Sequence, residues 1–171
     1  MWKEKVYNLS RNLEIMEKHV KILVNNSKAH FNYFLEDFLE CGIALQGTEI
    51  KSIRKNSANL NDSYVVIKNG EAFILNMTIS PYENGNIFNH EPNRTRKLLL
   101  HKREIFRINQ KCQQQKMVII PTKVYLYKGK VKVEIALGKG KKLYDKRETI
   151  KKRDDEKMMA QVKKNNGKDI Y

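Results

Sequence analysis

Residues 131–138 read Val-Lys-Val-Glu-Ile-Ala-Leu-Gly, an unbroken alternation of large apolar residues with polar or small ones. Successive side chains of a β-strand point to opposite faces, so this alternation is typical of a half-buried antiparallel strand. The sequence Lys-Gly-Lys at 128–130 indicates a turn that joins this strand to another at 123–127. We therefore expect an antiparallel sheet with one face against the core.

More strands are indicated on the N-terminal side of this hairpin. Residues 64–68 and 71–77 are strand-like runs separated by Asn-Gly at 69–70. Asn-Gly is a strong hairpin signal, because a type I′ turn requires positive φ at both central residues. Residues 41–45 and 117–120 are apolar runs of strand length.

Helices are expected between these strands. Residues 48–55 fit a short helix with Thr48 as its N-cap, since two isoleucines three apart share one face. Residues 98–115 show helical periodicity, whereas residues 81–92 have the composition of a loop. The regular alternation of a parallel sheet is missing. The fold class is therefore α+β, mainly β: a small antiparallel barrel or curved sheet with two or three helices.

The net charge of the chain favours a polyanionic partner. Its 171 residues include 34 Lys and Arg against 19 Asp and Glu, which gives a formal net charge of +15 and a pI near 9.8. This excess, on a chain long enough for one domain, favours nucleic acid over an acidic small substrate. The charge alone does not identify which nucleic acid is bound.

Motifs for catalysis, metal binding and membrane insertion are missing from the sequence. Cys41 and Cys112 lie far apart, and none of the four histidines pairs with another at metal-ligand spacing. There is no phosphate-binding glycine loop, no Gly-x-Ser-x-Gly element and no apolar stretch of about 18 residues. We therefore expect a cytoplasmic protein without enzymatic activity, metal, cofactor or membrane association.

Positive charge is concentrated in the C-terminal segment. Residues 139–168 hold twelve basic and five acidic residues, a net charge of +7, with few large apolar side chains. Such a segment cannot bury enough apolar surface to offset its ordering entropy, so we expect residues 139–171 to be a basic tail that is disordered when free. The alternative is a solvated terminal helix of mixed charge. Its sparse apolar residues could share one helical face, which suits folding on an RNA groove better than on an anionic membrane.

Two further segments precede the tail. Residues 1–26 are expected to be a leader that is helical in part. Met16 offers an internal start, so residues 1–15 are either an unusual extension or an upstream start. Residues 27–138 are expected to form the compact domain.

Glu40 is the carboxylate that stands out, because it follows Phe-Leu at 38–39 and directly precedes the expected strand 41–45. It is either a solvent-facing carboxylate at a strand end or an acceptor for amino and hydroxyl groups of bases and riboses. Phe31 and Tyr33 are either core aromatics or stacking platforms for bases.

A basic run surrounds the triple leucine at 98–100. It is either an amphipathic element with core leucines and solvated charges, or a rim that binds phosphates. The residues of this run are Arg94, Arg96, Lys97, His101, Lys102 and Arg103.

Several motifs, taken in order, resemble the SsrA-binding protein (SmpB) family. They are Gly-Ile-Ala-Leu-Gln-Gly-Thr-Glu-Ile-Lys-Ser-Ile-Arg at 42–54, Asn-Leu-Asn-Asp-Ser-Tyr at 59–64, Ile-Ser-Pro-Tyr at 79–82, Arg-Thr-Arg-Lys-Leu-Leu-Leu at 94–100 and Gly-Lys-Lys-Leu-Tyr-Asp-Lys-Arg at 140–147. The resemblance extends from about residue 25 to residue 153.

The resemblance implies an OB-like antiparallel barrel with about three packed helices, and a role in trans-translation without catalysis. The implied partner is tmRNA, whose tRNA-like part the barrel holds near its elbow. The basic tail would enter the empty mRNA channel of a stalled 70S ribosome, near the decoding centre and small-subunit rRNA, and become helical there. Alanyl-tRNA synthetase and elongation factor Tu would be indirect partners through tmRNA, and the protein would act as a monomer.

The resemblance also implies particular RNA contacts. In the barrel these are Glu40, Leu99 and His101, and Phe31 stands where the family usually has His, which would keep stacking but lose a hydrogen bond. Residues 158–171 match the family only in character. The residues implied to act at the ribosome are Lys139, Lys141, Lys142, Tyr144, Asp145, Lys146, Arg147, Lys151, Lys152 and Arg153. A general RNA-binding module or an RNA-processing enzyme would be the alternative functions.

Overall fold

The structure, a computed structural model, describes residues 20–166. The expected leader residues 1–15 and the last five residues lie outside the described part. The helices are α2 (Ser27–Asn32), α3 (Gly47–Arg54), α4 (Lys102–Gln115) and α5 (Leu143–Asn166), with a 3₁₀ turn at Asn86–Phe88. The strands are β1 (Val20–Asn25), β2 (Tyr33–Ile43), β3 (Ala58–Asn59), β4 (Tyr64–Lys68), β5 (Glu71–Leu75), β6 (Thr78–Ile79), β7 (Arg96–Leu99), β8 (Val118–Tyr127) and β9 (Lys130–Gly140).

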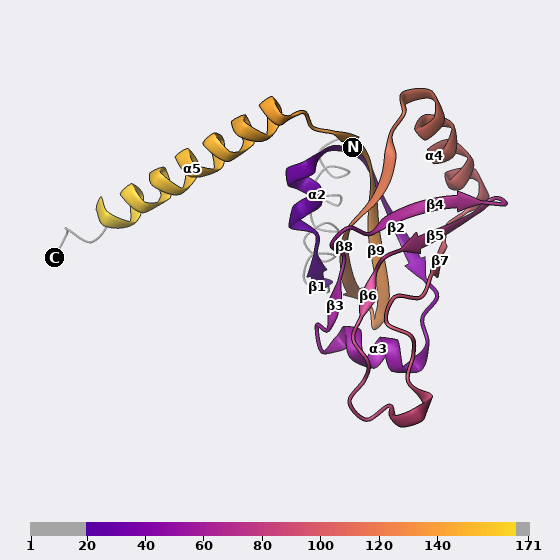
Figure 1. Cartoon of the computed structure of the whole chain (residues 1–171). Coiled ribbons are helices and arrows are strands. Elements are labelled where there is room, and N and C mark those ends of the chain that lie inside the picture. The colour runs from indigo at the N-terminus through magenta and orange to yellow at the C-terminus, as the bar shows by residue number, and fades with distance from the viewer. Residues whose placement is uncertain (1–19, 167–171) are drawn as a thin grey trace, which may run out of the picture.

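Seven of these strands form one antiparallel sheet that closes into a ring. The strand order is β1-β8-β4-β5-β7-β2-β9, and β9 also pairs with β8, so only β1 lies outside the closed circuit. Strands β3 and β6 form a separate two-stranded sheet. Helices α2, α3 and α4 lie around the ring (Figure 1). We call the closed circuit of six strands, β8-β4-β5-β7-β2-β9, the strand ring.

The alternation in β9 is confirmed by burial. Val133, Ile135 and Leu137 are at most 1% exposed and form part of the core inside the strand ring. On the other face of β9, Lys132 and Glu134 near the turn are half-buried, whereas Ala136 and Gly138 further along the strand are buried. A Cβ on Gly138 would lie 2.6 Å from Cδ1 of Ile120, so a side chain at this position would force the Ile120 side chain to move.

Both predicted hairpins are present. Strands β4 and β5 pair from Tyr64 with Leu75 to Lys68 with Glu71, and the Asn-Gly turn between them has φ values of 53° and 73°. Lys128 and Gly129 in the β8–β9 turn have φ values of 47° and 77°. Positive φ at both central residues is the geometry that the Asn-Gly sequence predicted, and the Lys-Gly turn has the same geometry.

Three predicted boundaries were wrong. Helix α3 begins at Gly47, so Thr48 is not its N-cap; the Gln46 amide donates to the Glu49 carboxylate at 2.6 Å. Helix α4 begins only at Lys102, because the preceding residues pair as strand β7 with β2 and β5. Residues 20–25 form strand β1 on β8 and are not part of a helical leader. The start of α4 and the fold of residues 20–25 are set by pairing with distant strands, whereas the start of α3 is set by the local contact between Gln46 and Glu49.

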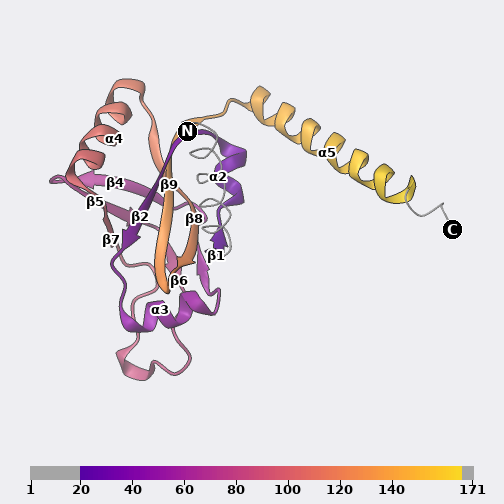
Figure 2. The ribbon, with the colours of Figure 1, turned by 180° about the vertical axis from the view of Figure 1, so that it is seen from behind.

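Helix α5 leaves the strand ring and extends away from it (Figures 1 and 2). Its side chains from Lys151 to Gln161 are exposed. The structure thus contains the terminal helix of mixed charge, which was one of the two alternatives. That the tail is disordered before it meets RNA stays a prediction. None of the helices within residues 20–166 is long and apolar enough to cross a membrane.

Candidate nucleic-acid interface

Glu40 lies within β2, opposite Glu134 of β9, rather than at the strand end that the sequence predicted. Its side chain is 45% exposed and has two fixed partners. The Tyr125 hydroxyl donates to one carboxylate oxygen, and the Lys132 ammonium lies 3.0 Å from the other. The hydrogen bond from Tyr125, followed by that from Lys132, lowers the pKa of Glu40 despite partial burial. Glu40 is therefore an ionised, oriented hydrogen-bond acceptor.

Sequence reasoning missed both partners of Glu40. Tyr125 and Lys132 are register partners in the β8–β9 hairpin, which the symmetric spacing around the turn could have predicted. Their contact with Glu40 depends on β2 pairing with β9, across about 90 residues of chain, for which no local signal exists.

The triple leucine is divided between the core and the surface. Leu98 is 1% exposed and lies in the core, whereas Leu99 is 56% exposed beside Gly42 of β2. A Cβ on Gly42 would lie 3.3 Å from the Leu99 Cβ, so glycine leaves room for this exposed leucine. Leu99 of β7 pairs with Gly42 of β2, and Glu40 lies two residues before Gly42 in the same strand. Both side chains are exposed.

A groove lies beside Leu99, between α3 and the β8–β9 turn. Its volume is about 480 Å³. Its cationic lining residues are Arg54, Lys130 and Lys132, and its apolar lining includes Leu99. We call this feature the cationic groove. It places positive charge next to the Glu40 and Leu99 surface.

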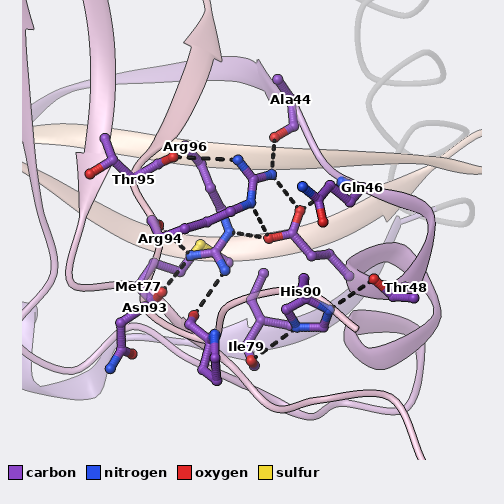
Figure 3. A network of polar contacts seen from close by, with 12 residues as sticks. Ala44, Gln46, Thr48, Met77, Ile79, His90, Asn93, Arg94, Thr95 and Arg96 are labelled. Atoms are coloured by element: carbon purple, nitrogen blue, oxygen red, sulfur yellow. Dashed lines mark hydrogen bonds and ion pairs between the residues drawn. The ribbon is translucent and has the colours of Figure 1, made fainter. Parts of the chain in front are cut away.

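Arg96 cannot bind phosphate, which corrects the prediction of a rim at this position. Its side chain is completely buried, with Nε 2.8 Å from Glu49 Oε1 and further donors on the Met77 and Pro92 carbonyls (Figure 3). Arg94 also forms an ion pair with Glu49, with its Nη2 2.6 Å from Glu49 Oε2, although its side chain remains 25% exposed. Burial raises the pKa of Glu49, but the hydrogen bonds from Arg94 and the Gln46 amide outweigh it and the net pKa is lowered.

The same network fixes the loop that precedes β7. His90 contacts the Thr48 hydroxyl through Nδ1 at 2.9 Å and the Ile79 carbonyl through Nε2 at 3.1 Å (Figure 3). Together with the Glu49 cluster, this contact ties α3 to β6 and to the start of β7. The network therefore has a structural role. It holds in place strand β7, which carries Leu99.

The rest of the basic run is exposed. Lys97 pairs with Glu71 at 2.5 Å, which reduces its availability for phosphate. His101, Lys102 and Arg103 are exposed at the N-terminal end of α4, and the His101 amide donates to Glu104 at 2.9 Å. These three side chains remain candidate RNA contacts near Leu99.

The aromatic residues lie at the base of the tail helix. Phe31 is half-buried, with the Lys146 ammonium 5.9 Å from its ring centroid. Tyr33 is half-buried beside Gly138 and is not part of the hydrophobic core, so its role in stacking stays a prediction. Phe34, which the sequence argument did not select, is 52% exposed and has the Lys141 ammonium 4.9 Å from its centroid. The aromatic surface at this end therefore includes Phe31, Phe34 and the exposed Tyr144.

The base of α5 is anchored through a few contacts. The Lys141 amide donates to the Asn32 carbonyl at 2.8 Å, and its ammonium donates to the His30 carbonyl at 3.1 Å. Asp145, in the first turn of α5, accepts from the Lys142 amide at 2.9 Å, as the acidic residue of a capping box does. The exposed candidates for ribosome contact are Lys139, Lys142, Tyr144, Arg147, Lys151, Lys152 and Arg153. Within residues 20–166, no group of three or more metal-ligating side chains could hold an ion.

Comparison with known proteins places these features in a family. The family model described as SmpB protein matches residues 23–165. The SsrA-binding protein of Caldicellulosiruptor bescii is 54% identical over 140 residues, covering 82% of this chain and 89% of the relative. That of Malacoplasma penetrans is 55% identical over 136 residues, covering 80% and 93%.

A solved structure gives the same result. A chain described under "tmRNA-SmpB: a journey to the center of the bacterial ribosome" is 39% identical to this one, with a TM-score of 0.60. The match covers 70% of this chain and 85% of that chain. Both the strand ring and most of the tail helix fall within the matched family region, and the chain belongs to the SmpB family of SsrA-binding proteins.

Proposed function

We propose that this chain is the RNA-binding factor of trans-translation, which binds the tRNA-like part of tmRNA and delivers it to stalled ribosomes. The observation that carries the proposal is an exposed, ionised Glu40 beside an exposed Leu99 on the strand ring of an SmpB-family chain. We also propose that the strand ring is an OB-like barrel, since closed antiparallel rings of this size commonly bind oligonucleotides on an outer face. In this proposal the protein acts by binding RNA and catalyses no reaction.

The tail supplies a second, separate interaction. Residues 139–168 carry a net charge of +7, and α5, which holds residues 143–166 of this segment, extends away from the strand ring. The mRNA channel of a ribosome is lined by phosphates, and an empty channel attracts this charge electrostatically. A channel filled by mRNA is already occupied, so the tail can distinguish stalled from translating ribosomes by competition.

The partners follow from this division of labour. The strand ring contacts tmRNA, and the tail contacts small-subunit rRNA near the decoding centre of the 70S ribosome. Alanyl-tRNA synthetase and elongation factor Tu take part through tmRNA rather than through this chain. The protein acts as a monomer in the cytoplasm, where ribosomes and tmRNA are found.

Capture of RNA from a bacterial lysate tests the proposal. The tagged full-length protein is pulled from lysate of its own host and the bound RNA is sequenced. We expect tmRNA to be enriched far above tRNA and rRNA fragments of similar abundance. Recovery of many structured RNAs in proportion to their abundance would instead support a general RNA-binding module.

A further inference from the structure

We infer that residues 2–16 form an amphipathic helix that packs antiparallel to β1 and covers its outward face. The inference concerns residues outside the RNA-contacting surface, and it does not depend on the proposed function. Residues 1–19 lie before the described part of the chain, and the SmpB family model matches only from residue 23 onward. The family match therefore assigns no role to this segment.

The segment before β1 has an apolar stripe at helical spacing. Five of its large apolar residues follow one another at intervals of four, three, four and three, the heptad spacing that places side chains on one face of a helix. At 3.6 residues per turn, Tyr7 and Ile15 fall about 140° from the centre of this stripe. Such a helix obtains most of its stability by packing its apolar face against other apolar surface. The residues of the stripe are Trp2, Val6, Leu9, Leu13 and Met16.

Strand β1 offers apolar surface and an open edge. Within residues 20–166, β1 pairs only with β8, so its other edge has no partner strand. Leu23 points into the core, whereas Ile22 is 58% exposed on the opposite face. Val20 and Tyr127 are register partners and lie half-buried on the same face as Ile22. An open edge with exposed apolar residues invites pairing with other chains unless another element covers it.

The lengths of the two elements match. A helix over residues 2–16 is about 22 Å long, and the six residues of β1 extend over about 20 Å. Residues 17–19 remain for the turn between them, which is an ordinary loop length. The helix then runs back along the whole of β1, with Met16 near Val20 and Trp2 near Asn25.

This arrangement brings Trp2 to a cavity at the end of β1. The strand leads directly into α2 (Figure 1), and Asn26 at this junction lines a cavity of about 590 Å³. The lining of the cavity includes Tyr64 and Val118, which are both exposed to solvent. A tryptophan side chain buries about 150–250 Å² and prefers such a mixed apolar and aromatic surface. Docking of the helix therefore buries Trp2 and covers Ile22 at the same time.

Tryptophan fluorescence of the full-length protein tests the inference, because Trp2 is the only tryptophan in the sequence. The emission maximum and the acrylamide quenching of Trp2 are measured in buffer and in denaturant, at several protein concentrations. Leu13→Gln removes a residue of the stripe. Ile15→Gln is its matched control, because Ile15 lies on the other face of the same helix.

A second pair of variants tests the surface on β1. Ile22→Thr removes the exposed apolar side chain and keeps a β-branched residue, which suits a strand. Ile87→Thr is the control, because Ile87 is 83% exposed and lies outside both β1 and the cavity lining. Thermal unfolding checks that each variant is folded.

We expect Trp2 of the wild type to emit at a shorter wavelength in buffer than in denaturant and to be quenched severalfold less, at every protein concentration. Leu13→Gln and Ile22→Thr should shift the emission toward that of the denatured chain, whereas both controls keep the wild-type emission. Equal emission in buffer and denaturant, or equal effects of Leu13→Gln and Ile15→Gln, would overturn the inference. Protection of Trp2 that grows with protein concentration would place a second copy on β1 and would equally overturn docking within one chain.

Discussion

Tyr125 shows how one buried residue can control an exposed one. It is 6% exposed, yet its hydroxyl donates to the carboxylate of Glu40, which is open to RNA. Burial and this hydrogen bond raise the pKa of Tyr125 far above its usual range, so the hydroxyl remains a donor at every physiological pH. We expect Tyr125 to be a positioning residue that holds Glu40 in the orientation that RNA requires.

A double-mutant cycle checks this role of Tyr125. Tyr125→Phe removes only the hydroxyl and should weaken RNA binding about 5-fold, since a hydrogen bond of this kind contributes on the order of 1 kcal/mol. In a Glu40→Ala background, the same substitution should have no further effect, because no acceptor is left for the Tyr125 hydroxyl to orient. Equal losses in both backgrounds would show that Tyr125 acts independently of Glu40.

At the scale of elements, Glu49 connects α3 to the start of β7. Its carboxylate is fully buried between Arg94 and Arg96. Glu49→Gln should lower the free energy of unfolding by about 3–5 kcal/mol, because it leaves a buried guanidinium without its counter-charge. Denaturant unfolding measures this loss. Glu83→Gln is the matched control, since Glu83 forms an exposed pair with Lys55 and should leave stability nearly unchanged.

The pH dependence of stability has a defined sign for Glu49. Its pKa is lower in the folded protein than in the unfolded chain, so its contribution is present above about pH 4.3. That contribution is lost as pH falls through the folded pKa. The wild type should therefore lose stability on acidification more steeply than Glu49→Gln, and parallel curves would contradict the assignment.

Strand β9 offers a test of packing within the strand ring. Gly138→Ala would place a Cβ 2.6 Å from Ile120 Cδ1, and overpacking of this kind costs about 1–3 kcal/mol. Gly140→Ala in the same strand meets nothing within 4 Å and serves as the control. Thermal unfolding should show a lower melting temperature only for Gly138→Ala. Equal melting temperatures would mean that β8 and β9 are less closely packed.

The sequence predicted those elements whose signal is local. Alternation in 131–137 and the Asn-Gly and Lys-Gly turns predicted strand β9 and both hairpins, because register and turn geometry depend on adjacent residues. The start of α4 was predicted too early, since the leucines at 98–100 fit a helical period but pair in a sheet. Local periodicity cannot reveal a partner strand far along the chain.

The candidate site was predictable only in part for the same reason. Family resemblance selected Glu40 and Leu99, and the structure places both on an exposed surface. Composition could not separate the buried Arg96 from exposed cations, because its partner Glu49 lies 47 residues away. Arg54 gave no signal in the sequence, since its position beside Lys130 arises only when α3 meets the β8–β9 turn.

At the scale of the whole molecule, we propose that tmRNA binding and ribosome recognition belong to different parts of the chain. Residues 33–140 contain the strands that carry the Glu40 surface, and Lys141, just before α5, joins the start of the tail to the Asn32 and His30 carbonyls of α2. Truncation after Lys142 should leave affinity for the tRNA-like part of tmRNA nearly unchanged and abolish peptide tagging on stalled ribosomes in a reconstituted translation system. Retained tagging, or lost RNA binding, would contradict this division.

The affinity of the full-length Glu40→Gln variant for the tRNA-like part of tmRNA tests the central claim most directly. The substitution removes a charged acceptor, which contributes about 1.5–3 kcal/mol, so binding should weaken by about 10-fold or more. Glu36→Gln, in the same strand and also exposed to solvent, should bind like the wild type, and both variants should unfold at the wild-type temperature. Wild-type affinity in Glu40→Gln would contradict the account.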